Sequence, residues 1–190
     1  MRWIISFIAS VLPYMLIVLP QVVLWRAVRI RMLKKAGQKT NWRHECGVCV
    51  FFLFLAGLAS LTILPGPGGR FTGIIDPGSV SLTPLEVFSP FREGFHAYSF
   101  TVLLGNIVMF MPIGFCVPLL WDVTLPKTVL LGLCASLLIE LCQLPLTRVT
   151  DIDDVWLNTL GGLLGCLVFW GFRRLAPQTA QSFKVGRGGG

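Results

Sequence analysis

The stretch SLLIELCQLPLTRVTDIDDVWLNTLGGLLG, residues 136–165, decides the fold of this chain. Glu140 and Gln143 interrupt one long apolar run, and a polar turn that contains Arg148 precedes the next apolar run. An ionisable side chain at membrane depth costs about 2.5–3.5 kcal/mol on insertion scales, so it marks a functional site with a partner. The stretch predicts two membrane helices whose polar groups meet at one membrane face.

The composition of the whole chain fits a bilayer as its solvent. Of the 190 residues, 54% are hydrophobic and 13% are charged, and the mean hydropathy is +0.75. A soluble domain typically has about 25% charged residues. At about 20 residues per spanning helix, the length admits five spans and their loops, without room for a separate soluble domain.

Five apolar segments are long enough to span a membrane, and they predict an all-α, polytopic helix bundle. Prolines inside them are compatible with helix, because neighbouring helices can satisfy the freed carbonyl groups. We expect the first segment to be a retained span and not a cleaved signal peptide, because its apolar run is longer than a signal core and a basic loop follows it. The segments cover residues 3–25, 46–64, 100–121, 128–146 and 155–172.

The distribution of Lys and Arg predicts the orientation. Loop 26–45, Lys127 and residues 173–190 together hold 12 of the 16 basic residues. The positive-inside rule places that side in the cytoplasm, with the N-terminus outside and the C-terminus inside. This asymmetry, together with anionic inner-leaflet lipid, accounts for the net charge of +7, so we expect no nucleic-acid partner. The glycine-rich end predicts a flexible tail over residues 176–190.

The outer loop, residues 65–98, is long and rich in Pro and Gly. Loops of this length are usually lids, binding loops or disordered segments. Its apolar residues, such as Leu82, Phe88 and Phe91, favour a part that lies on the membrane or caps the bundle. We interpret His96 as an ordinary surface histidine.

Polar side chains of three spans fall at one depth. At 1.5 Å per residue, Asn106 lies about 10 Å below the outer surface, and Glu140 lies at a similar depth. Asn158 lies just under the same surface, and Gln143 shares a helix face with Glu140. The predicted ligand-binding residues are Asn106, Glu140, Gln143, Arg148, Asp151, Asp154 and Asn158.

The charged members also have structural explanations. Asp153 or Asp154 can cap the fifth helix and complement its dipole. Arg148 can pair with Asp151 or with Glu140 only to hold the turn. Glu140 is the hardest to explain in this way, because contacts between helices rarely need a carboxylate.

The uncharged residues of this region fit contacts between helices. Asn106 and Asn158 can form interhelical hydrogen bonds, and Gly161 and Gly165 form a small-xxx-small pair that favours close packing. The sequence contains no H-E-x-x-H, no G-x-S-x-G, no P-loop and no paired His ligands, which excludes the chemistries of those motifs. We expect no cofactor.

The cysteines do not form a disulfide scaffold, because most of them lie in apolar runs where Cys behaves as a small hydrophobic residue. Cys46 and Cys49 lie next to His44 at the start of a span. A metal or redox site there is less favoured than an ordinary helix start.

Residues 106–165 resemble the VanZ-like family of membrane proteins. NIVMFMPIGF is similar to the family's Asn followed by an aromatic-Pro-x-Gly run, and SLLIELCQ to its Glu-x-x-Gln element. RVTDIDDVWLNTLGGLLG is similar to its Arg, Asp-x-Asp-Asp and Asn-Thr-x-Gly elements. The loop stretch SLTPLEVFSPF is similar in part to an Asn-Leu-x-Pro-Phe motif but lacks the Asn. The matching residues are Asn106, Phe110, Pro112, Gly114, Glu140, Gln143, Arg148, Asp151, Asp153, Asp154, Asn158, Thr159, Gly161 and Gly165.

The resemblance implies an integral cytoplasmic-membrane protein from a family associated with resistance to teicoplanin, a lipoglycopeptide. It places a VanZ-like domain at residues 46–175, after a first helix and basic loop at 1–45.

Three functions compete on these residues. An outward-facing polar site could bind an outer-leaflet amphiphile, either a lipid-linked cell-wall precursor or a lipoglycopeptide. An enzyme acting on a lipid-linked substrate could use the aspartates for acid–base chemistry or to hold Mg²⁺. A transporter ranks third, because the sequence has no visible inverted repeat and no polar path to the cytoplasm. The oligomeric state stays open.

Overall fold

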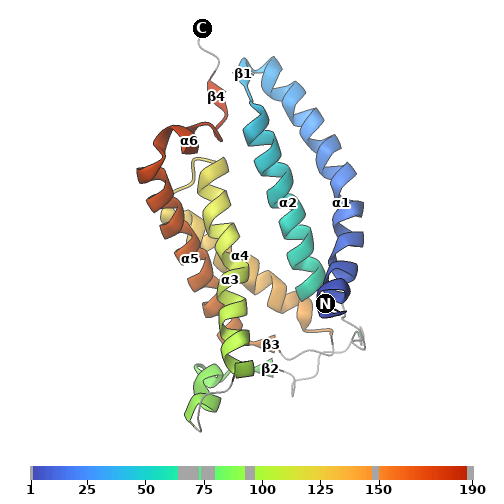
Figure 1. Ribbon diagram of the computed structural model, residues 1–190, viewed down its shortest axis with the longest axis vertical. Helices are drawn as coiled ribbons and strands as arrows, with labels where there is room; N and C mark the ends of the chain where they lie inside the picture. The colour runs from blue at the N-terminus through green and yellow to red at the C-terminus, as the bar shows by residue number, and fades with distance from the viewer. Residues whose placement is uncertain (1, 64–72, 74–79, 93–96, 147–149, 188–190) are drawn as a thin grey trace.

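The computed structural model describes residues 2–63, 73, 80–92, 97–146 and 150–187. Within these residues five helices are long and apolar enough to cross a membrane, which confirms the predicted helical membrane fold. They lie side by side in an elongated bundle (Figure 1). Their bounds are α1 Arg2–Lys35, α2 Trp42–Thr62, α3 Ala97–Leu120, α4 Leu125–Gln143 and α5 Ile152–Leu175.

The first helix is longer than predicted. Most of the basic residues that we expected in loop 26–45 continue α1 as far as Lys35. Arg, Lys, Leu and Met are strong helix formers, and cations in the last turn complement the helix dipole. The connection to α2 therefore shrinks to residues 36–41.

A side-chain cap starts α2 at a defined residue. Asn41 has extended backbone and accepts a hydrogen bond from the His44 N–H through its side chain, at 2.9 Å. Asparagine is among the preferred N-cap residues, because it satisfies a donor that the first turn leaves free. Cys46 and Cys49 therefore lie in the first turns of α2, where Cys46 is exposed and Cys49 is half-buried.

The close approach of α3 and α5 depends on glycine. A Cβ at Gly161 would lie 2.2 Å from the Ile107 carbonyl oxygen, and one at Gly165 would lie 2.0 Å from the Met111 carbonyl oxygen. Backbone contacts this short admit no side chain, so the predicted small-xxx-small packing is confirmed. On the other side of α3, the largest apolar core joins it to α2 and α4 through Val48, Phe51, Phe110, Ile113 and Ile139.

Two short strand pairs close the two ends of the bundle (Figure 1). At one end β1 (Gln38–Lys39) pairs antiparallel with β4 (Gly186–Arg187). At the other end β2 (Val80–Ser81) pairs in parallel with β3 (Thr150–Asp151). The 3-10 helix η2 (Glu86–Arg92) follows β2, so the described part of the long outer loop packs on the bundle.

The segment after α5 folds back onto the bundle, where the sequence predicted a flexible tail. Helix α6 (Pro177–Gln181) buries Ala180, and Lys184 donates to the carbonyls of Pro118 and Trp121 at 2.7 and 2.8 Å. A helix leaves its last carbonyl groups without partners, and a lysine ammonium satisfies those at the end of α3. We call this segment, residues 176–187, the C-terminal strap.

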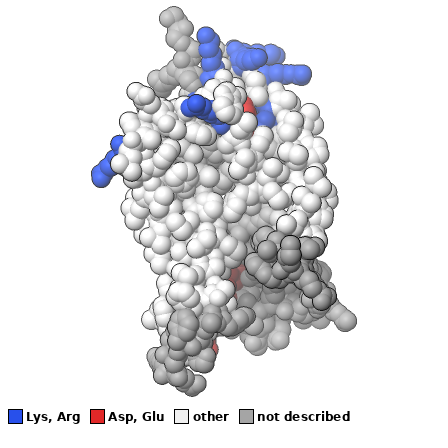
Figure 2. All heavy atoms as spheres, in the orientation of Figure 1, with Lys and Arg blue, Asp and Glu red and all other residues white. Residues whose placement is uncertain are grey.

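The described Lys and Arg side chains gather at the end that carries the strap, which we call the basic end (Figure 2). They come from the last turns of α1, the starts of α2 and α4, the last turns of α5, and the strap. The opposite end carries all the described carboxylates except Glu45 and Asp122, and we call it the acidic end. These are Glu86, Glu140, Asp151, Asp153 and Asp154.

Candidate functional site

A row of three buried polar side chains lies along one face of α4 at the acidic end. Ser136, Glu140 and Gln143 are separated by four and three residues, so they share one face of the helix. All three are buried, with exposures of 0%, 6% and 8%. Glu140 therefore points into the protein and not into the acyl chains.

Glu140 contacts the turn that precedes α5. Its carboxylate accepts a hydrogen bond from the Asp151 N–H at 3.3 Å. One turn further along α4, Gln143 donates to the Thr62 carbonyl at the end of α2, at 2.9 Å. The row on α4 thus joins the start of α5 to the end of α2.

Two asparagines connect α5 to its neighbours. Asn106 of α3 donates to the carboxylate of Asp154, and Asn158 donates to the Ser136 hydroxyl of α4 at 2.9 Å. The Asn158 carbonyl oxygen is buried and has no hydrogen-bond partner in the structure. Helices α3, α4 and α5 therefore share one polar layer, as the sequence predicts.

Asp151 is the N-cap of α5, whereas the sequence suggested Asp153 or Asp154 for that role. Asp151 has extended backbone and accepts from the Asp153 N–H at 2.9 Å. Asp153 and Asp154 follow in the first turn, where their charge complements the helix dipole. Partial burial raises the pKa of the Asp151 carboxyl, and the nearby Asp153 and Glu86 carboxylates raise it further.

Asp153 holds the outer loop onto the bundle. Its two carboxylate oxygens accept from the backbone N–H groups of Leu85 and Val87 at 2.7 and 2.8 Å, and one of them also accepts from the Trp156 indole. Leu85 has φ +66°, a left-handed conformation that costs a residue with a side chain about 1–3 kcal/mol. Phe88 stacks on the Trp156 ring and adds an apolar contact to the same junction. Asp153 is therefore a structural clamp.

A cavity of about 290 Å³ opens between η2, α3 and the start of α5. We call it the acidic cavity, because carboxylates dominate its polar lining. Two serine hydroxyls supplement them. Its polar lining residues are Glu86, Ser89, Ser99, Asp151, Asp153 and Asp154.

The structure brings most of the predicted site residues into three hydrogen-bonded pairs at the acidic end. Asn106 bonds to Asp154, the Asp151 N–H bonds to Glu140, and Asn158 bonds to Ser136, while Asp151 and Asp154 also line the cavity. Gln143 follows Glu140 on the same face of α4 and bonds to the end of α2. Arg148 and His96 lie outside the described residues.

The described part of this site is rich in acceptors. Its carboxylates meet amide and backbone donors, and no described Lys or Arg forms an ion pair with them. Among the residues that the structure describes, no group of three His, Cys, Asp or Glu side chains is placed to hold a metal ion. That includes the described His44, Cys46 and Cys49.

Sequence reasoning missed Ser136, Ser99 and Glu86. A signal for Ser136 was present, because it lies four residues before Glu140 on a face that Gln143 continues. Ser99 lies one turn before Val102 and two before Asn106 on the same face of α3. No local pattern marked Glu86, which reaches the cavity through the fold of the loop.

Comparison with known proteins gives one match. The family model VanZ/LLP1 matches residues 51–174, which run from the middle of α2 through α3 and α4 to the last turn of α5. Neither a curated protein nor a solved structure matches the chain. Since the family model covers well over half of the sequence, this membrane protein belongs to the VanZ/LLP1 family.

Proposed function

We propose that the acidic cavity binds the head group of an amphiphile in the outer leaflet of the cytoplasmic membrane. The observation that carries the proposal is the cavity itself, where Asp151 and Asp154 lie beside two serine hydroxyls at the mouth of a membrane bundle. Half-buried carboxylates with no described cation are costly in a membrane protein, so such groups are retained where a ligand uses them.

The chemistry of the lining defines the ligand class. Carboxylates only accept hydrogen bonds, so the complementary head group must be rich in hydroxyl, amide or ammonium donors. Sugar and peptide groups supply these donors. A lipid-linked cell-wall precursor and a lipoglycopeptide such as teicoplanin both carry them, and retention of either at the membrane is a route to glycopeptide resistance.

The charge distribution supports an orientation. Every described Lys and Arg side chain belongs to the basic end. Cytoplasmic loops carry the excess of Lys and Arg in membrane proteins, so the basic end faces the cytoplasm. The acidic cavity then opens to the outside, with the N-terminus outside and the C-terminus inside.

Arg148 remains the proposed cation of the site. It follows Leu146 by two residues and precedes Asp151 by three, in the turn between α4 and α5. A guanidinium recognises phosphate or carboxylate with two parallel hydrogen bonds. Arg148 would thereby serve the anionic part of a ligand whose donor groups face the carboxylates.

The alternative is a metal-assisted enzyme acting on a lipid-linked envelope substrate. The observation that favours it is the pair of carboxylates, Asp151 and Asp154, on one cavity, since Mg²⁺ is usually held by one or two carboxylates and keeps several waters. The aspartate between them, Asp153, already accepts three hydrogen bonds from Leu85, Val87 and Trp156. Turnover of an undecaprenyl-linked substrate that requires Mg²⁺ and is lost in Asp154→Asn would favour this alternative.

A binding experiment tests the proposal. The protein is placed in nanodiscs, and its affinity for teicoplanin and for an undecaprenyl-linked precursor is measured against empty nanodiscs. Asp154→Asn should weaken binding of at least one probe about tenfold or more, because a hydrogen bond to a charged group contributes about 1.5–3 kcal/mol and 1.4 kcal/mol is tenfold. Arg148→Ala should weaken the same probe.

The control is Asp122→Asn, which makes the same change at an exposed aspartate of the basic end. It should bind like the unaltered protein. The proposal is overturned if neither probe binds above empty nanodiscs, or if Asp154→Asn and Asp122→Asn bind equally well.

A further inference from the structure

A second cavity lies in the membrane-spanning part of the molecule. It has a volume of about 250 Å³ and is lined by apolar side chains and one glycine from α1, α2 and α3. We call it the apolar groove. The lining residues that matter here are Val11, Met15, Gly57, Leu61 and Met109.

One face of α3 contributes residues to both the acidic cavity and the apolar groove. Ser99 and Val102 line the acidic cavity, and Met109 lines the groove. Asn106 lies between them and holds Asp154. The spacings of three, four and three residues place these four side chains on one helix face. A molecule that follows this face passes from carboxylates to hydrocarbon within about 10 Å, given 1.5 Å per residue.

The α2 wall of the groove also ends at the polar layer. Leu61 lines the groove, and the next residue, Thr62, accepts the hydrogen bond from Gln143. Gly57, one turn away, leaves room for α1, because a Cβ there would lie 3.2 Å from a Val11 methyl group. Both walls therefore lead from the interior of the bilayer to the residues of the proposed head-group site.

We infer that the apolar groove holds the hydrocarbon chain of the amphiphile whose head group binds in the acidic cavity. This inference rests on the proposed function. The apolar lining offers nothing to a peptide backbone or a sugar, whose polar groups would lose their hydrogen bonds there. The polar layer at one end fits the junction between the head group and the chain, so the preferred ligand is a lipid and not a water-soluble head group.

The groove provides selectivity more than affinity. Lipid tails are as apolar as the groove, so a chain gains only packing contacts when it moves there from the bilayer. Filling the groove should therefore weaken binding modestly, and only for ligands that carry a chain.

Met109→Trp tests the inference, since a larger side chain at Met109 fills the groove without altering a carboxylate. The matched control is Val108→Trp, which makes a similar change on the same helix at a side chain that is 56% exposed and faces the bilayer. The probe is the undecaprenyl-linked precursor, compared with its chain-free head group. Affinities are measured in nanodiscs for both variants and for Asp154→Asn.

The expected result is an approximately fivefold loss for the chain-bearing probe in Met109→Trp, with the chain-free probe and the Val108→Trp variant unchanged. Asp154→Asn should weaken both probes. The groove inference is overturned if Met109→Trp and Val108→Trp bind the chain-bearing probe equally while Asp154→Asn still weakens it, since an ordinary phospholipid chain would then be the only occupant. If Asp154→Asn also has no effect, the proposed function fails as well.

Discussion

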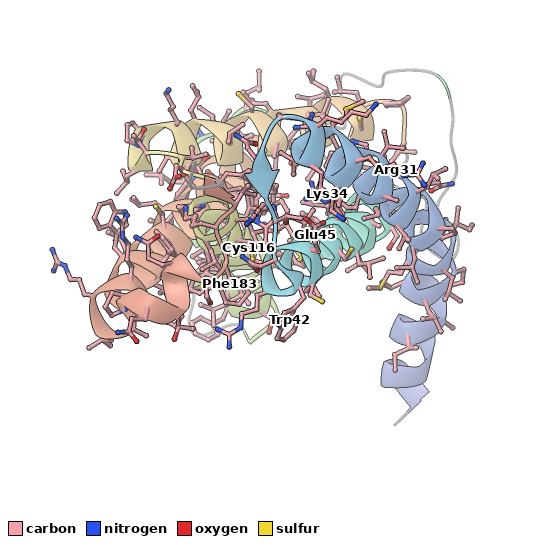
Figure 3. The ribbon with its side chains drawn as sticks, turned by 90° about the horizontal axis from the view of Figure 1, so that it is seen from above. Arg31, Lys34, Trp42, Glu45, Cys116 and Phe183 are labelled. Carbon is pink, nitrogen blue, oxygen red and sulfur yellow. The ribbon has the colours of Figure 1, made fainter. Side chains whose placement is uncertain are left out.

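The charged side chains at the two ends of the molecule have different kinds of partner. At the basic end, Arg26 is buried and forms two hydrogen bonds with Glu45, at 2.7 and 2.8 Å, and Lys184 is bound by two carbonyls and by Asp122. Figure 3, viewed from that end, shows Glu45 between α1 and α2. At the acidic end, the described carboxylates meet amides, hydroxyls and backbone N–H groups, with no described cation.

This difference suggests a structural role for the charges of the basic end and a binding role for those of the acidic end. Charges that satisfy one another hold helices together, and they have little capacity left for a ligand. Carboxylates without cations destabilise a membrane protein, and at the acidic end no described cation offsets that cost, which is consistent with the proposed binding site. The two ends should therefore respond differently to the removal of a charge.

The largest effect is expected from breaking the buried ion pair. Glu45→Ala leaves the Arg26 guanidinium buried without its carboxylate, and removal of one partner of a buried pair costs about 3–5 kcal/mol. The free energy of unfolding in detergent would measure this loss. Arg29→Ala removes an exposed arginine from the same helix and should be nearly neutral. Equal stability of the two variants would contradict a structural role for the pair.

Asp153 lies at the acidic end, but we expect its loss to destabilise the protein, as the loss of a paired charge at the basic end does. Asp153→Asn replaces an acceptor by an NH₂ group that faces a backbone donor, so it should lower the free energy of unfolding by about 2–3 kcal/mol. Limited proteolysis of the outer loop would report release of Leu85 and Val87. A stable variant with a protected loop would show that the strand pair β2–β3 alone holds the loop.

The polar layer also requires α3 and α5 to stay in contact. Gly165→Ala places a methyl group against the Met111 carbonyl and should destabilise the protein by about 1–3 kcal/mol or more. Gly171→Ala, in the same helix with open space around it, should be neutral or stabilising by up to about 1 kcal/mol, because alanine favours helix. Thermal unfolding of the two variants would test the difference, and equal transitions would contradict the close contact.

Asp154 gives the most direct test of whether a carboxylate of the acidic end serves binding or stability. Asp154→Asn keeps an oxygen that can accept from Asn106 but removes a half-buried charge that has no described cation. We expect the free energy of unfolding to rise by about 1 kcal/mol while ligand binding falls, since groups retained for function are often destabilising. A variant that loses stability and binding together would indicate that Asp154 is a structural residue.

The smallest effect is the pH dependence of Asp151. Because the folded protein raises the pKa of this carboxyl above its ordinary value of 3.8, the folded state binds the proton more tightly than the unfolded state. Its contribution to stability is therefore largest below pH 3.8 and is lost as pH rises through the folded pKa. Asp151→Asn keeps an N-cap residue and should remove this component from unfolding curves measured between pH 3.5 and 7. An unchanged profile would assign the component to another group.

The sequence alone was sufficient for the parts of the fold that depend on hydropathy and spacing. Apolar segments of spanning length predicted the five helices, and Gly161 and Gly165 predicted the α3–α5 contact. The shared depth of Asn106, Glu140 and Asn158 predicted the polar layer, because a helix advances by a fixed rise per residue.

Features that depend on backbone direction or on distant residues could not be predicted. In Asp-Ile-Asp-Asp, the phase of the first turn decides that Asp151 caps α5 and that Asp153 points to the outer loop. The Leu85 and Val87 N–H groups that Asp153 binds lie 66 to 68 residues away. The ordering of the C-terminal strap likewise depends on partners in α2 and α3, which no local pattern indicates.

The contact between the strap and the start of α2 has a consequence for biosynthesis. The fully buried His44 ring bonds to the Phe183 carbonyl 139 residues later, and Asn41 donates to the Lys184 carbonyl 143 residues later. At about 5–20 residues per second of translation, roughly 7–28 s separate the synthesis of these partners. This contact can therefore form only after nearly the whole chain has been synthesised, well after α1 and α2 are complete.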